Sequence, residues 1–360
     1  MRVLVLTNTP AHVHLYRHAV AELRERGHEV LVLARDYGCT VALLEQYGTP
    51  FETYGACGTT QRSLFANLPA QYARLLPTAV RFDPDVVFGM GAYAAHAGLV
   101  ARAPTVLVLD SEPTSLDHAV SKPFARALLT PAAFTKDLGE RHHVFEGFKE
   151  SAYLHPGRFT PDPTVRDELG VGPDERFALV RLNAFGSHHD VGRGGFDDDQ
   201  RRALLTSLAE EATVLVSDEG GDLDLSGLPA RRYDAHPALL HDALAAADLL
   251  VADTQTMVTE AALLGTPAVR SNAFVGEADM GNFLALERAG LVRNVAAFED
   301  VLATASGLLA DGGAVADWRA RRDEYVTDMV DLTGVIVDVA EVRGDPTGVG
   351  GLRRRATAGD

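Results

Sequence analysis

The chain has 360 residues, of which 46% are hydrophobic, and its formal net charge is −17. This length suffices for two domains, and the negative charge argues against a nucleic-acid partner, because phosphate backbones are bound by basic surfaces. No apolar run approaches the roughly 18 residues of a membrane span, and Cys39 and Cys57 form neither a metal spacing nor a disulfide framework.

The amino-terminal part alternates between short apolar runs and helical patterns. Strands are expected near residues 2–6, 29–34, 51–53, 86–88 and 105–109, and helices near 11–26, 38–47, 63–81 and 94–101. In a doubly wound sheet the loop after the first strand faces the ligand crevice, and here it holds His12 and His14. The loop lacks the G-x-G-x-x-G fingerprint, so a dinucleotide is not indicated. His14 and His18 share a helical face, but no third ligand is evident nearby, so we expect no metal.

Two carboxylates follow the strand at 105–109. Asp110 and Glu112 are candidate acid/base groups, because a carboxylate in a closed cleft can have its pKa raised toward the working pH. The alternative is that both cap a helix starting near Leu116.

The segment 153–163 is rich in proline and lacks periodicity, which is typical of a linker. We therefore expect an amino-terminal domain over 1–152 and a second domain over 164–315. A crossover helix over 316–342 and a disordered tail over 343–360 would follow.

The second domain opens with a strand at 177–182 that contains Arg181 and precedes a glycine-rich loop. That loop holds His189 and Asp190, and a histidine beside an aspartate suits general acid/base chemistry. Arg181 could pair with phosphate oxygens. The alternative is a plain glycine-rich loop. Asp197–Asp199 should cap the helix that reaches Leu208.

The stretch from Asp248 to Phe283 organises this domain. A buried strand ends at Asp253, a helix runs from about Thr256 to Leu264, and Gly265 closes that helix. Such turns lie at the carboxyl end of a parallel sheet, where free N–H groups and the helix dipole favour an anion such as phosphate. The alternative is an ordinary strand–helix unit with a polar cap.

This stretch carries a family resemblance. Asp253-Thr254-Gln255 and the segment 260–267 resemble D-S-G-G-x-Q-E-E-A-x-x-L-G-x-P of UDP-N-acetylglucosamine 2-epimerases, with Thr254-Gln255 in place of the glycine pair. Over roughly residues 1–340 the chain is similar to an archaeal group, domain-of-unknown-function family 354. The shared motifs are S-Q-T-M-x-x-E-A-A-x-L-G-T-P, N-x-F-V-G and D-M-G-N-F.

The resemblance implies an α/β protein with two Rossmann-like doubly wound domains facing a cleft, the GT-B type. A nucleotide-diphosphate sugar would bind mainly to the second domain. The residues implied in binding are Asp253, Thr254, Gln255 and Thr256 around the phosphate, Glu260 on the ribose, Arg181 and Arg270 against the phosphate charge, and Asp279 near the sugar.

Three functions remain open at this point. The first is glycosyl transfer in surface glycan or glycoconjugate synthesis, with His12, Asp110 or Glu112 deprotonating an unknown acceptor. The others are 2-epimerisation of a UDP-N-acetylhexosamine and nucleotide-sugar binding without catalysis. We expect no cofactor and no metal. A homodimer is one assembly that the sequence allows. Three of the 33 basic residues are lysine, and this acidic, lysine-poor composition predicts a salt-rich cytoplasm.

Overall fold

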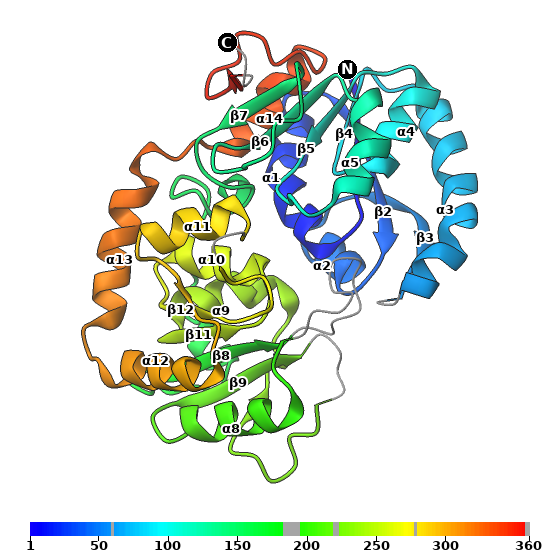
Figure 1. Ribbon diagram of the computed structural model, residues 1–360. Coiled ribbons are helices and arrows are strands. Elements are labelled where there is room, and N and C mark those ends of the chain that lie inside the picture. The colour runs from blue at the N-terminus through cyan, green and yellow to red at the C-terminus, as the bar shows by residue number, and fades with distance from the viewer. Residues whose placement is uncertain (59–60, 183–194, 219–222, 277–278, 357–360) are drawn as a thin grey trace. The chain divides into compact units, whose positions relative to one another are not determined.

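The computed structural model describes residues 1–58, 61–182, 195–218, 223–276 and 279–356, and the chain divides into two units (Figure 1). Unit 1 comprises Met1–Arg158 together with the chain from Asp328 onward, and unit 2 comprises Phe159–Thr327. Unit 2 is thus inserted between two segments of unit 1. Within the described residues, no helix has both the length and the apolar composition that crossing a bilayer requires.

Unit 1 alternates strands and helices, as its sequence predicts. In chain order its elements are β1 (Arg2–Thr7), α1 (Pro10–Glu25), β2 (Glu29–Asp36), α2 (Thr40–Gln46), β3 (Phe51–Ala56), α3 (Gln61–Phe82), β4 (Val86–Gly89), α4 (Ala92–Ala101), β5 (Thr105–Val108), α5 (Ser115–Ser121), the 3-10 helix η1 (Lys122–Phe124), β6 (Ala127–Pro131), β7 (His142–Phe145), α6 (Ser151–Leu154), α14 (Leu332–Glu341) and β14 (Arg353–Arg354).

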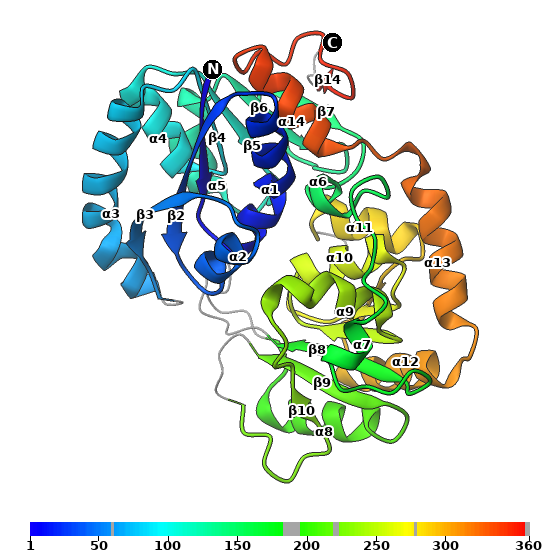
Figure 2. The same cartoon turned by 180° about the vertical axis from the view of Figure 1, so that it is seen from behind.

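The unit 1 sheet has the order β14-β7-β6-β5-β4-β1-β2-β3, parallel except for β14. Leu4 and Leu6 alternate along β1 with Val3 and Val5, and the first pair packs with residues of α3 and α4. Figure 2 shows α1 and α14 beside one another, away from α3 and α4. Strands β1 to β3 are added toward one edge of the sheet and β4 to β7 toward the other, so the switch point of the strand order lies between β1 and β4. In folds of this kind, the crevice for ligands lies outside the carboxyl ends of the two strands at the switch point.

Unit 2 repeats this arrangement on a smaller scale. Its elements are α7 (Val165–Glu168), β8 (Phe177–Leu182), α8 (Asp198–Leu208), β9 (Thr213–Asp218), β10 (Arg231–Arg232), the 3-10 helix η2 (Pro237–Leu239), α9 (Leu240–Ala246), β11 (Leu249–Ala252), α10 (Thr256–Leu264), β12 (Ala268–Arg270), α11 (Gly281–Arg288), β13 (Arg293–Asn294), α12 (Phe298–Ala310) and α13 (Ala314–Tyr325), followed by η3 (Val326–Asp328) at the boundary with unit 1.

All strands of the unit 2 sheet are parallel, in the order β10-β9-β8-β11-β12-β13. Val180 and Val251 belong to a core cluster with Leu204 of α8 and Val301 of α12, while α9 and α10 pack against each other. The helix α8 begins at a capping box between Asp197 and Gln200, which confirms the predicted cap. The switch point of this sheet lies between β8 and β11, so the carboxyl end of β11 is the expected ligand edge.

The carboxyl-terminal segment differs from the prediction. A single crossover helix was expected over 316–342, but the chain forms α13 and α14 with η3 between them, and unit 1 resumes at Asp328. The expected disordered tail is wrong for residues 343–356, because β14 pairs antiparallel with β7, with Arg353 opposite Val144. The expected linker also begins too early, since Tyr153 lies in α6, within unit 1.

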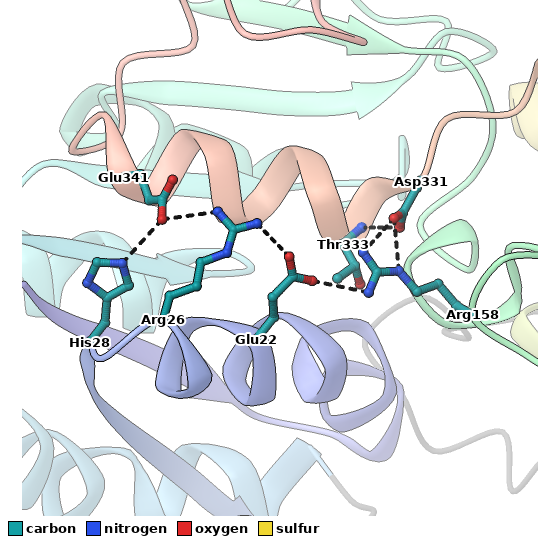
Figure 3. A network of polar contacts seen from close by, with 7 residues as sticks. All are labelled: Glu22, Arg26, His28, Arg158, Asp331, Thr333 and Glu341. Carbon is teal, nitrogen blue, oxygen red and sulfur yellow. Dashed lines mark hydrogen bonds and ion pairs between the residues drawn. The ribbon is translucent and has the colours of Figure 1, made fainter.

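Ion pairs attach α14 to α1 (Figure 3). Arg158 contacts Asp331 at 2.6 Å and Glu22 at 3.1 Å, and Arg26 contacts Glu22 at 2.6 Å and Glu341 at 3.1 Å. Partly exposed pairs of this kind contribute little individually. The stronger attachment is apolar, because Ile336 and Val339 on α14 are buried.

Candidate functional site

The carboxyl edge of the unit 2 sheet carries the polar turn that the sequence singles out. Asp253 follows β11 directly, and its amide N–H donates to the carbonyl oxygen of Arg181 on β8 at 3.3 Å. Its own carbonyl oxygen accepts from Asn272 Nδ2 at 3.0 Å. The turn is therefore fixed to both neighbouring strand ends, at the carboxyl edge of the sheet as predicted.

The helix α10 begins in this turn without a side-chain cap. Gln255 is its N-cap residue and makes no side-chain cap hydrogen bond in the described part of the chain, and the first turn contains no acidic residue. Thr254 Oγ1 is buried and has no hydrogen-bond partner among the described residues. Gly265 closes the helix at a φ of 75°, as predicted. The open helix start and the hydroxyl of Thr254 together suit an anion.

Glu260 lies one turn further along α10, and its side chain is 3% exposed. Its Oε1 atom is 3.0 Å from Nε2 of His241, a buried histidine on α9. Glu260 therefore helps to join α9 to α10. This contact within unit 2 competes with the ribose contact that the family resemblance implies.

Arg270 and Asp279 were expected near the phosphate and the sugar, but they form a buried ion pair with each other. Both side chains are completely buried, with Arg270 Nη1 at 2.5 Å from Asp279 Oδ2 and Nη2 at 3.2 Å from Oδ1. Asn294 Oδ1 accepts a further bond from Arg270 at 3.1 Å, and the guanidinium lies 3.7 Å from the centre of the Phe283 ring. The guanidinium is occupied by this bidentate pair, so its geometry favours a structural role over contact with phosphate or sugar.

Arg181 lies at the ligand edge of β8, and its Nη1 donates to Ser217 Oγ on β9 at 2.6 Å. The two neighbouring strands thus present a guanidinium and a hydroxyl at one edge. His189 and Asp190 lie outside the described residues.

The carboxyl edge of unit 1 is organised around Asn8, which follows β1. The Asn8 amide N–H donates to His12 Nδ1 at 3.2 Å, and its carbonyl oxygen accepts from Arg35 Nε at 3.1 Å. The hydroxyl of the buried Tyr54 donates to Asn8 Oδ1 at 2.8 Å. Asn8 therefore brings together residues from β1, α1, β2 and β3.

His12 is held as a neutral imidazole. Burial, and then the positive charges of Lys149 and Arg35, lower the pKa of His12 from 6.5 to about 3. Because Nδ1 accepts the Asn8 N–H, the proton of the neutral ring belongs on Nε2. A ring in this tautomer donates a hydrogen bond from Nε2, so the geometry favours a donor role for His12 over the predicted role as base.

Asp110 and Glu112 separate into two environments. Asp110 forms an ion pair with Lys149, which also lies 3.5 Å from Glu150. Glu112 is buried and accepts from the amide N–H of Thr135 at 3.1 Å. The N-cap residue of α5 is Thr114, so neither carboxylate occupies the cap position that the alternative reading gave them. Asp110 keeps 17% of its side chain exposed and is the better placed of the two for contact with a ligand.

The glycine turn after β4 has a local occupant. Gly91 has a φ of 78°, and the next amide N–H, that of Ala92, donates to Asp117 Oδ1 at 3.0 Å. A Cβ atom on Gly91 would lie 2.8 Å from the Asp117 carboxyl carbon. The small residue thus admits a carboxylate of this chain to the start of α4.

Sequence reasoning missed Arg35 and Lys149 as parts of the unit 1 edge. Arg35 lies at the carboxyl end of β2, next to the loop that was singled out after β1. Applying the same strand-end rule to β2 would have found it. Lys149 carried no comparable signal, because it follows β7, which was not predicted.

One hollow in unit 2, of about 500 Å³, lies away from these residues. It is lined by residues that precede β8 and β11, among them Arg176 and Asp248, so it lies at the amino-terminal edge of the sheet. Arg166 in its wall donates to backbone carbonyl oxygens of Gly172 and Ala246. We therefore place the candidate site at the carboxyl edges.

Sequence comparisons identify relatives of two kinds. A family model described as a protein of unknown function (DUF354) matches residues 2–180. An uncharacterised protein of Methanocaldococcus jannaschii is 24% identical over 285 residues, covering 73% of this chain and 79% of that protein. A UDP-N-acetylglucosamine–N-acetylmuramyl-(pentapeptide) pyrophosphoryl-undecaprenol N-acetylglucosamine transferase of Nitratidesulfovibrio vulgaris is 31% identical over 144 residues, 36% of this chain and 40% of the transferase.

Solved structures confirm the predicted GT-B fold class. A UDP-GlcNAc 2-epimerase of Neisseria meningitidis, bound to UDP-GlcNAc, aligns with a TM-score of 0.61 at 12% identity, over 95% of this chain and 98% of that one. A glycosyltransferase of Streptomyces sp. SF2575, complexed with thymidine diphosphate, aligns with a TM-score of 0.60 at 17% identity, over 95% and 99% of the two chains. At these identities the likeness shows the fold alone.

Proposed function

We propose that the chain, whose residues 2–180 match the family model DUF354 and whose fold is of the GT-B type, is a glycosyltransferase that uses a nucleotide-diphosphate sugar. The observation that carries the proposal is the uncapped start of α10 at the switch point of the unit 2 sheet. The diphosphate would accept N–H bonds there, and the helix dipole would stabilise the negative charge that grows as it leaves. The partial match to an N-acetylglucosamine transferase supports the same reaction class.

The roles of the unit 1 residues follow from their bonding. Asp110 is the base that takes the proton of the acceptor hydroxyl as that oxygen attacks the sugar and the bond to the diphosphate breaks. Lys149 orients the Asp110 carboxylate through their ion pair. His12 donates a hydrogen bond from Nε2 to an oxygen of the substrate. Glu112 maintains the loop at Thr135 and takes no part in proton transfer.

The binding half of the proposal is tested at Thr256, which is partly exposed at the first position of α10. Thr256→Glu places a negative charge where phosphate would bind, yet an acidic residue in the first turn stabilises a helix. Thr256→Gln is the matched neutral control. UDP, GDP and dTDP would be titrated against both variants by calorimetry. We expect one nucleotide to bind the wild type and the glutamine variant, and to bind the glutamate variant at least about tenfold more weakly. Equal affinity of both variants would contradict the proposal.

The catalytic half is tested with Asp110→Asn and Glu112→Gln. With the corresponding nucleotide sugar, NMR would follow the release of free nucleoside diphosphate. The asparagine variant should lose turnover by a factor of about 10² or more, the usual contribution of a general base, and keep its nucleotide affinity. The Glu112 variant should retain turnover. The reverse pattern would exchange the two roles.

Epimerisation is the second candidate, favoured by the structural likeness to a UDP-GlcNAc 2-epimerase over 95% of the chain. The same NMR experiment separates the two reactions. A changed sugar that is still attached to its nucleotide would establish epimerisation, and free diphosphate would establish transfer. Binding without either product would support a protein that binds nucleotide sugars without catalysis.

A further inference from the structure

Arg35 is a nearly buried cation that the proposed reaction does not use. It lies at the carboxyl end of β2 with 9% of its surface exposed. Its Nε donates to a backbone carbonyl oxygen, that of Asn8. Although the chain has 50 acidic and 33 basic residues, Arg35 forms no ion pair with a carboxylate in the described parts of the chain. A buried charge without a counter-ion is costly, which points to a partner supplied from outside.

The backbone around Arg35 departs from regular pairing. The register between β2 and β3 shifts between Ala34 and Arg35, so that Arg35 lies opposite Gly55 and not opposite Tyr54. Irregularities of this kind re-aim side chains and occur often beside functional sites. The extra residue, Tyr54, bonds to Asn8, so the irregular pairing and the carbonyl contact of Arg35 belong to one arrangement.

Two aromatic rings flank the guanidinium. Its Cζ atom lies 5.4 Å from the ring centre of Tyr37 and 5.7 Å from that of Tyr93, both of which are partly exposed. Rings at this distance stabilise a cation without neutralising it. They also fix the plane of a group that binds carboxylate or phosphate through two parallel hydrogen bonds.

The charged groups near Arg35 do not neutralise it. Lys149 is already paired with Asp110, and His12 is neutral at pH 7, because its pKa is lowered to about 3 by burial and then by Lys149 and Arg35. The positive potential at His12 is therefore not cancelled by residues of this edge. An anion bound at Arg35 would cancel part of it and raise the pKa of His12.

We propose that Arg35, between Tyr37 and Tyr93, binds a carboxylate or phosphate group, and that this group belongs to the acceptor substrate. The assignment to an acceptor rests on the proposed glycosyl transfer, whereas the anion site itself does not. Arg35 would then select acidic acceptors over neutral ones and position the acceptor hydroxyl toward Asp110.

The test uses the intact protein and two probes, inorganic phosphate and acetate, titrated by calorimetry at constant ionic strength, with and without saturating nucleoside diphosphate. The variants are Arg35→Gln, Arg35→Lys and the control Arg81→Gln, which removes an arginine whose side chain is 71% exposed in the same unit. We expect at least one probe to bind the wild type and the Arg81 variant alike. Arg35→Gln should bind it at least about tenfold more weakly than the wild type. Arg35→Lys should have an intermediate affinity, because lysine keeps the positive charge and cannot form the two parallel hydrogen bonds of a guanidinium. Arg35→Lys also covers the case in which the glutamine variant fails to fold.

Each outcome has one meaning. Equal binding by the wild type and a folded Arg35 variant, or no binding of either probe, overturns the anion site and leaves the nucleotide proposal standing. Failure of every nucleotide to bind, with phosphate binding still dependent on Arg35, overturns the transferase and keeps the anion site. If nucleoside diphosphate displaces the probe and binds Arg35→Gln more weakly, the anion is that of the donor, and the acceptor assignment is wrong. Simultaneous binding of probe and nucleotide supports the acceptor.

Discussion

The two sheets have the same strand order around their first strands, but the polar groups at their carboxyl edges differ. At the unit 1 edge, Arg35 has no carboxylate partner among the described residues, and Asp110 pairs with Lys149 beside a neutral His12. At the unit 2 edge, the turn from Asp253 to Thr256 offers hydroxyls, an amide and a helix start. The unit 2 ions Arg270 and Asp279 are paired internally.

This difference shows how one architecture can present two kinds of binding surface. The strand order fixes where each crevice lies, and the residues that follow the strands decide what it can bind. Unit 2 offers backbone N–H groups, which suit a diphosphate of any nucleotide sugar. Unit 1 offers charged and aromatic side chains, which are more selective. The predictions below would break or sharpen this contrast.

The largest effect is expected at the buried pair of unit 2. Asp279→Ala would leave Arg270 buried without its partner and should lower the free energy of unfolding by about 3–5 kcal/mol, measured by urea denaturation. Asp317→Ala, in an exposed pair with Arg321 at 3.9 Å, is the matched control and should cost no more than about 0.5 kcal/mol. A fall in nucleotide affinity with unchanged stability would instead show that Arg270 contributes to nucleotide binding. Both edges would then use a guanidinium to bind an anion.

The next effect concerns the neutral state of His12 in unit 1. Its pKa falls from 6.5 to about 3 on folding, so between these pH values the unfolded chain binds the additional proton. The stabilisation by neutral His12 is therefore complete above pH 6.5 and is lost as the pH falls toward 3. Between these limits the wild type should lose up to about 1.4 kcal/mol per pH unit more than His12→Asn. Parallel stability curves from urea melts between pH 4 and 7 would refute the neutral state of His12.

The glycine turn of unit 1 allows a smaller comparison. Gly91→Ala adds a Cβ atom against the Asp117 carboxylate at a positive φ, whereas Gly139→Ala has a φ of 95° with no atom within 4 Å. Both variants pay the conformational strain, and only the first meets the carboxylate. Thermal denaturation should show Gly91→Ala less stable than Gly139→Ala by about 1–2 kcal/mol. Equal losses would show that Asp117 can move aside.

The smallest effect is expected for Asp117→Ala, which removes the carboxylate from the start of α4. Loss of such a bond should cost about 1 kcal/mol. It would also leave the unit 1 turn as open as the turn before α10. If an open helix start at the switch point is what attracts phosphate, this variant should bind inorganic phosphate more tightly than the wild type by calorimetry. No gain would show that the unit 2 turn depends on further groups, such as Thr254.

Local sequence signals predicted much of the fold and the position of the unit 2 turn. Asp197 caps α8, Gly265 closes α10, and Asp253 follows β11 because short polar residues and glycine have strong preferences at element ends. The strand–helix alternation predicted the parallel strands, and the family resemblance implied their doubly wound order.

What the sequence could not show was which charged residues pair inside the protein. Arg270 and Asp279 are nine positions apart and resembled ligand groups, but only the packing of β12 against the following loop buries them together. Lys149 and Asp110 are 39 positions apart and meet at the edge of one sheet. The tail from 343 has the composition of a disordered segment, yet Gly344 packs near Val86 and Val106, and Arg353 pairs with β7. Such long-range contacts leave no local pattern.

The insertion of unit 2 between two segments of unit 1 affects the order of folding during synthesis. Every strand of unit 2 lies between Phe177 and Asn294, in one continuous segment that leaves the ribosome before the last helix of unit 1. The face of α1 that α14 covers stays exposed until Leu332–Glu341 has been made. Unit 1, whose first segment is made before unit 2, is therefore expected to finish folding after it, and a released chain truncated after Thr327 should contain a folded unit 2 and an incomplete unit 1.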